Sequence, residues 1–186
     1  SWRSGDGFLT GVMDIFDTQE GLEAYAGPGR WNDPDLLMVG LYGQGKSSSP
    51  DERFKGCTDE EYKTHFALWC MLAAPLIVNN DLRTMSDFTR ELLTNRHLIA
   101  VDQEGYTFMR SDDLQFLRKE LVDGVAICLF NRSAEPKSFV FDPVGDAEIL
   151  YPATVTNAWT GRVSKKGIVR GTLPAHGCEV YVYKRK

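Results

Sequence analysis

The chain has 186 residues, 42% of them hydrophobic and 25% charged, which is the composition of an ordinary globular protein of one or two domains. Its formal net charge of −5 argues against a nucleic-acid partner, because binding to phosphates requires a basic surface. No apolar run approaches the roughly 20 residues of a membrane helix, so no membrane partner is expected. The chain opens on Ser1 without an initiator methionine, and we expect it to be part of a longer protein. Its localisation and oligomeric state stay open.

Four cysteines show neither CxxC spacing nor a histidine placed for zinc. Cys70, Cys128 and Cys178 fall in apolar patterns and are expected to be buried free thiols. A Cys57–Cys70 disulfide stays open, because it depends on a secretory origin. The sequon that begins at Asn131 has meaning only in a eukaryotic secretory pathway.

The first third of the chain alternates helical and strand-like patterns. Apolar residues recur at helical spacing over residues 12–16, and Gly21 is expected to interrupt that helix. A GPG turn at residues 27–29 then precedes residues 36–39, an apolar run typical of a strand buried on both faces.

A second helix is predicted after Thr58, which forms a T-x-x-E capping box with Glu61. Pro75 is expected to end this helix, and residues 76–78 to form another short buried strand. Ser86 can cap a further helix. His65, beside the apolar stripe of the second helix, is expected to be an ordinary helix histidine.

This alternation of strands and helices is typical of parallel α/β units. After Asp102 the pattern changes to short strand-like clusters separated by turn signals, which predicts an antiparallel β-sandwich. We therefore expect two domains, 1–103 and 104–186. A complete (β/α)₈ barrel takes about 250 residues, so residues 1–103 could hold only a part of such a barrel.

The densest polar chemistry lies at residues 31–35, WNDPD, next to the first predicted strand. Carboxylates beside a buried element are costly to desolvate unless they are paired or face an open cleft. On a strand, Asp33 and Asp35 would point to the same face. A metal site would need further oxygen ligands that nothing local supplies, and Trp31 could stack on a sugar or pack in the core. The plain alternative is an Asx-Pro turn that caps a strand.

Three blocks resemble the signature of glycoside hydrolase family 27, the melibiase or α-galactosidase type. They are GPGRWNDPDLLMVG from Gly27, WCMLAAPLIVNNDLR from Trp69 and NRHLIAVDQ from Asn95. The resemblance covers residues 1–103 and implies the last units of a (β/α)₈ TIM barrel followed by a β-sandwich.

In this family two carboxyl groups act with retention of configuration. The K-x-D-x-C motif that carries the family's nucleophile does not occur in these 186 residues. The resemblance implies that Asp6 is the acid/base, although it follows Arg3 by three residues where four are common, with Asp14 as the runner-up. It also implies that Arg3 and Asp35 bind sugar hydroxyls. Asp33 is expected to support its neighbours or to bind directly.

The resemblance implies a substrate with terminal α-linked galactose, in an oligosaccharide or glycoconjugate, and no metal or organic cofactor. The chain alone is expected to be inactive because the nucleophile is absent. The alternatives are a non-catalytic carbohydrate-binding or structural remnant, or a relative specific for α-N-acetylgalactosamine or β-L-arabinopyranose.

Overall fold

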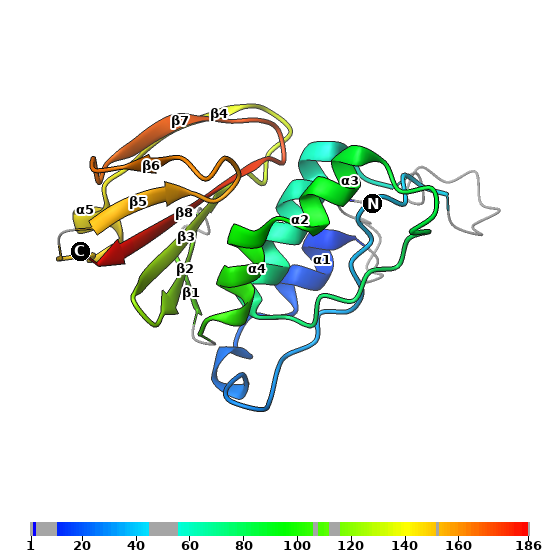
Figure 1. Cartoon of the computed structure of the whole chain (residues 1–186), viewed down its shortest axis with the longest axis horizontal. Coiled ribbons are helices and arrows are strands. Elements are labelled where there is room, and N and C mark those ends of the chain that lie inside the picture. The colour runs from blue at the N-terminus through cyan, green and yellow to red at the C-terminus, as the bar shows by residue number, and fades with distance from the viewer. Residues whose placement is uncertain are drawn as a thin grey trace.

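The computed structural model describes residues 2, 11–44, 56–105, 108–111, 116–151 and 153–185. Most helices occupy one side of the molecule, and the antiparallel strands with one short helix occupy the other (Figure 1). The helical side contains α1 (Val12–Asp17), a 3₁₀ turn η1 (Glu23–Tyr25), α2 (Asp59–Leu72), α3 (Asp87–Leu93) and α4 (Arg96–Gln103). The first helix ends before Gly21, as predicted, and α3 begins at the expected Ser86 cap.

Helix α2 is the centre of the helical side. The predicted capping box is confirmed, because the Thr58 hydroxyl accepts from the Glu61 N–H and the Glu61 carboxylate accepts from the Thr58 N–H. The helix ends at Leu72, where Ala73 adopts a left-handed conformation with φ of 53°. The end therefore lies before Pro75, and a left-handed cap, rather than the proline, terminates the helix.

The two predicted buried strands are reduced to one parallel bridge between Leu37 and Val78. The Leu37 N–H donates to the Ile77 carbonyl at 2.9 Å, and the Asn79 N–H donates to the Leu37 carbonyl at 3.1 Å. Burial on both faces was wrong, since Met38 and Ile77 expose 42% and 54% of their surface. Among the residues that the structure describes, no further strand pairs beside this bridge, and these side chains are left uncovered.

The β side forms two antiparallel sheets, as the sequence predicted. Six strands pair in the order β1-β2-β3-β8-β5-β6 and two pair as β4-β7. The strands are β1 (Phe108–Arg110), β2 (Phe116–Leu121), β3 (Gly124–Phe130), β4 (Lys137–Phe141), β5 (Ala153–Asn157), β6 (Val163–Ser164), β7 (Val169–Leu173) and β8 (Cys178–Arg185). A short helix, α5 (Pro143–Ala147), follows the Asp142-Pro143 turn signal.

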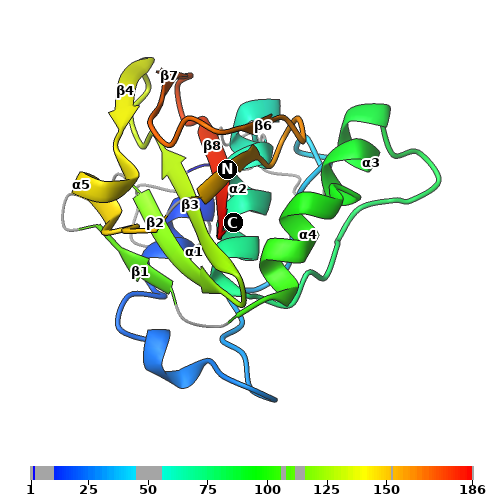
Figure 2. The ribbon, with the colours of Figure 1, turned by 60° about the vertical axis from the view of Figure 1, so that its left-hand side comes forward.

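Strand β3 connects the two cores because all seven of its residues are buried. Successive side chains of a strand point to opposite faces. Ala126 and Cys128 therefore belong to the core shared with the helices, whereas Val125 and Ile127 belong to the core between the two sheets. Figures 1 and 2 show the same layering, with α2 and α4 on one face of the large sheet and β4 and β7 on the other.

Polar contacts join the helical side to the β side. The Arg132 guanidinium binds both carboxylate oxygens of Asp17, at 2.8 and 2.6 Å. His176 Nδ1 lies 2.7 Å from the Glu61 carboxylate at the start of α2. The Thr64 hydroxyl, also on α2, donates to the His176 carbonyl at 2.7 Å. The two sides are thus held together by specific contacts as well as by a common apolar core.

All four cysteines are buried and free, so the expectation for Cys70, Cys128 and Cys178 is confirmed, and Cys57 is not bridged. The sequon residue Asn131 is only 2% exposed, and its amide donates to the carbonyls of Glu135 and Pro174. Its amide is therefore inaccessible in the folded chain. Among the described helices, none has the length and apolarity needed to cross a membrane.

Candidate active site

The WNDPD segment follows the predicted GPG turn. Gly27 and Arg30 exchange backbone hydrogen bonds of 2.9 and 3.0 Å, and Gly29 has a φ of 74°, which glycine adopts without strain. Trp31 then exposes 55% of its surface. The alternative that Trp31 packs in the core is therefore wrong, and its indole ring is available at the surface.

Asp33 and Asp35 lie together, but not on a strand. Asp35 has a φ of 74°, in the left-handed region, so the expectation that both side chains share a strand face was wrong. The Asp33 carboxylate accepts from the Asp35 N–H at 2.9 Å, and the Asp35 carboxylate accepts from the Leu36 N–H at 2.7 Å. Both aspartates are exposed. The arrangement is an Asx turn in which Asp33 orients the backbone of Asp35.

The runner-up for the acid/base, Asp14, lies in the first turn of α1. Its carboxylate accepts from the Gly11 N–H at 3.2 Å, which gives it a role at the helix N-terminus. Arg3 and Asp6 lie outside the residues that the structure describes.

A buried lysine and a buried aspartate lie where the helical side meets the β side, and no sequence pattern indicated them. Lys119 on β2 is fully buried, and burial lowers the pKa of its ammonium to about 8. Its ammonium donates to the carbonyls of Cys70, Val101 and Asp102 at 2.9, 2.6 and 3.3 Å. Burial also raises the pKa of Asp102 to about 6. The Lys119 ammonium therefore joins β2 to the ends of α2 and α4 through backbone carbonyls.

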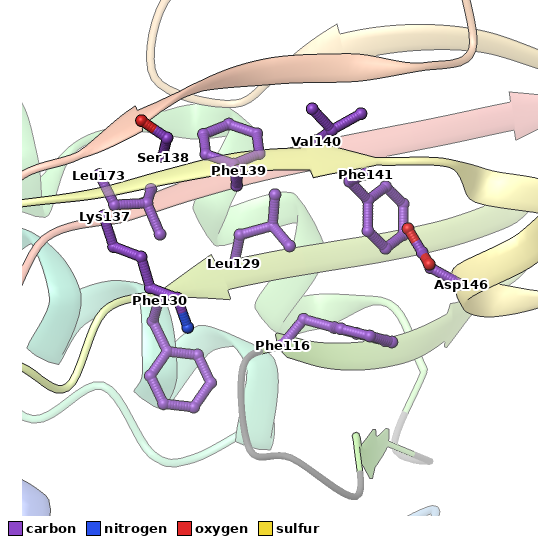
Figure 3. A pocket seen from close by; sticks show the side chains of 10 residues that line it. All are labelled: Phe116, Leu129, Phe130, Lys137, Ser138, Phe139, Val140, Phe141, Asp146 and Leu173. Carbon is purple, nitrogen blue, oxygen red and sulfur yellow. The ribbon is translucent and has the colours of Figure 1, made fainter.

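Two of the cavities that the described residues line could hold a ligand by their size. One of about 470 Å³ is bounded by Trp31, the turn after α2 (73–76), Asp102 and Gln103. The other, of about 310 Å³, lies between the sheets, with Lys137 and Asp146 at opposite ends (Figure 3). The Asp146 carboxylate accepts from the Asp142 N–H at 2.7 Å, so it is engaged in the turn before α5. This second cavity is lined mainly by apolar side chains of the sandwich and offers no carboxylate pair.

Metal ligation is not supported by the described residues, which contain no group of three or more histidine, cysteine, aspartate or glutamate side chains that could hold an ion. The His65 ring, which burial keeps neutral by lowering its pKa to about 3, packs edge-on against Trp69. His65 is accordingly a core residue of α2. The chemistry available in this part of the chain is that of exposed carboxylates held by backbone donors.

Comparison with known proteins identifies the family. The family model described as α-galactosidase A matches residues 1–104, and the model described as the α-galactosidase C-terminal β-sandwich domain matches residues 111–183. α-Galactosidase A of Cellvibrio japonicus is 36% identical over 97% of this chain and 44% of its own length. An α-galactosidase of Cyamopsis tetragonoloba is 36% identical over 85% of this chain and 38% of its own length.

A crystal structure of a candidate α-galactosidase from Bacteroides fragilis superposes with a TM-score of 0.83 at 33% identity, covering all of this chain and 40% of that protein. The chain thus spans 38–44% of the length of these two curated relatives. The expected fold is confirmed as the last βα units of a (β/α)₈ barrel followed by an antiparallel β-sandwich. The chain belongs to the melibiase type of α-galactosidases, glycoside hydrolase family 27.

Proposed function

We propose that the chain forms the C-terminal part of a retaining glycoside hydrolase that removes terminal α-linked galactose from an oligosaccharide or glycoconjugate. The observation that carries this proposal is the WNDPD segment, where two exposed aspartates are held in a fixed turn at the surface. Exposed carboxylates with defined orientation suit the recognition of sugar hydroxyls, which donate hydrogen bonds. Family membership supports the same assignment.

In this proposal Asp6 is the general acid and base. Its carboxylic acid protonates the departing glycosidic oxygen, and the resulting carboxylate then removes a proton from the attacking water. Arg3 and Asp35 bind sugar hydroxyls, and Asp33 holds the backbone of Asp35. The nucleophilic carboxylate would come from a segment outside these 186 residues, since the chain carries no K-x-D-x-C motif.

The exposed apolar side chains at the Leu37–Val78 bridge support a requirement for more of the barrel. The Leu37–Val78 bridge is parallel, and Val78 itself is exposed, as are Met38 and Ile77 next to the bridge. Parallel strands are normally buried on both faces, so further strands and helices would cover these side chains in the working enzyme. We further propose that residues 1–103 are the barrel part and residues 104–186 a separate sandwich domain.

Azide rescue tests the assignment of Asp6. In the complete reading frame that encodes this chain, Asp6→Asn should slow cleavage of a natural galactoside by roughly 10²–10⁴-fold, the usual contribution of a general acid. The first step on p-nitrophenyl α-galactoside should suffer less, because p-nitrophenolate leaves without protonation. Azide, which needs no base, should restore turnover and yield α-galactosyl azide.

Asp14→Asn is the matched comparison, since it removes the charge of the runner-up carboxylate. Rescue of Asp14→Asn by azide, without rescue of Asp6→Asn, would show that the acid/base is Asp14. Asp35→Asn should weaken the binding of every galactoside and should not respond to azide, because its proposed role is in binding.

A further inference from the structure

Trp69 does more than fill the core of the helical side. It lies on α2 and is 1% exposed. Its indole N–H, however, leaves the core and donates to the backbone carbonyl of Asp35 at 2.8 Å. The bond joins α2 to the exposed turn that carries the proposed sugar-binding carboxylate.

The backbone of Asp35 needs such a contact. Its φ of 74° lies in a region that aspartate tolerates but does not prefer, and such residues persist where their surroundings fix them. Two of the hydrogen bonds that fix it are local, from its own N–H to Asp33 and from the Leu36 N–H to its carboxylate. The Trp69 bond holds the third polar group, the carbonyl, and it comes from an element 34 residues away in the chain.

Trp69 is itself held rigidly. His65, one turn earlier on α2, packs edge-on against the indole with ring centroids 4.2 Å apart. The next residue, Cys70, has its carbonyl bound by the Lys119 ammonium at 2.9 Å. The indole N–H is therefore a fixed donor, and the carbonyl that accepts from it cannot turn away without losing the bond.

We infer that Trp69 is a positioning residue, which sets the direction of the Asp35 carboxylate toward the sugar by anchoring the left-handed Asp35 backbone to α2. This role rests on the proposed function of Asp35 in substrate binding. It predicts that loss of a single N–H in the core changes recognition of the galactosyl group at the surface.

Hydrogen exchange in the 186-residue chain tests the anchor without reference to activity. Trp69→Phe keeps a buried aromatic ring and removes the N–H. The Asp35 and Leu36 amides should then exchange about fivefold to tenfold faster, which corresponds to one net hydrogen bond. Trp159→Phe is the control, because the Trp159 indole nitrogen is buried without a partner. Unchanged exchange of both amides in Trp69→Phe would overturn the inference.

A double-mutant cycle in the complete reading frame tests the consequence for substrate. Trp69→Phe should raise KM for a galactoside about fivefold to tenfold, the same loss of one hydrogen bond, and by less than about twofold when Asp35→Asn is already present. If the increases in KM caused by Trp69→Phe and Asp35→Asn simply multiply in the double variant, Trp69 acts only on stability and not through Asp35. That result would overturn the inference. If Asp35→Asn leaves KM unchanged while exchange accelerates as expected, the anchor stands and the proposed role of Asp35 is wrong.

Discussion

Replacing Lys119 by methionine tests how the helical side and the β side are joined. The Lys119 ammonium is the donor to the Val101 and Asp102 carbonyls, which lie in the last turn of α4, where no further helical N–H follows. It also donates to the Cys70 carbonyl near the end of α2. Methionine keeps an unbranched apolar stem but removes all three donors.

Two opposing effects set the change in unfolding free energy that Lys119→Met causes. Leaving the Val101 and Asp102 carbonyls without a donor costs about 1–3 kcal/mol each, or about 4 kcal/mol together. Burial lowers the pKa of Lys119 from 10.5 to about 8, so the fold disfavours the ammonium by about 3 kcal/mol at 1.36 kcal/mol per pKa unit. The substitution removes that penalty. The expected net loss of unfolding free energy at pH 7 is therefore about 1 kcal/mol.

The loss should grow with pH. Because the pKa of Lys119 is lower in the folded chain, the unfolded chain binds more protons between pH 8 and pH 10.5, and the parent gains stability as pH rises through that window. The Lys119→Met variant lacks this gain. The difference in unfolding free energy between the parent and the variant should therefore widen by up to about 3 kcal/mol.

Urea unfolding at pH 7 and pH 10, followed by circular dichroism, measures both effects. Lys184→Met is the control, because Lys184 is exposed on β8 and should show neither change. A Lys119→Met chain at least as stable as the parent, with a difference that does not depend on pH, would refute the reasoning that the ammonium secures the ends of α2 and α4.

Two further outcomes are expected. Asp102→Asn should stabilise the chain at pH 7 by up to about 3 kcal/mol, because burial raises the pKa of Asp102 from 3.8 to about 6 and the fold therefore disfavours its carboxylate. The midpoint of urea unfolding should show this gain in stability above pH 6 and its loss toward pH 4. A gain that does not depend on pH would contradict the raised pKa of Asp102. The folded chain should not accept a glycan at Asn131, because the side-chain amide is buried and donates to two carbonyls. The test is incubation of the native chain with an oligosaccharyltransferase, followed by mass spectrometry. Modification of Asn131 would contradict this expectation.

Local signals in the sequence were sufficient for several elements. The capping box at Thr58 and Glu61 placed the start of α2, because its two hydrogen bonds join residues three apart. The short strand-like clusters after Asp102 indicated antiparallel strands, because turn signals separate them, and the structure confirms two antiparallel sheets there. The family motif predicted the barrel and sandwich, because GPGRWNDPDLLMVG is long and specific.

Features that depend on residues far apart in the chain could not be predicted from local signals in the sequence. The apolar runs at 36–39 and 76–78 predicted buried strands, but burial on both faces depends on neighbouring strands, and the described residues place none beside the Leu37–Val78 bridge. The left-handed Asp35 and its bond to Trp69 depend on a contact across 34 residues. Lys119 was missed for the same reason, since its acceptors lie 49, 18 and 17 residues away.

The stereochemistry of hydrolysis tests the central claim most directly. The complete reading frame, incubated with p-nitrophenyl α-galactoside, should release α-galactose as the first product seen by proton NMR, because two displacements retain configuration. The isolated 186-residue chain should give no turnover above a blank. β-Galactose as the first product, or no cleavage of the α-galactoside by the complete reading frame, would contradict the account.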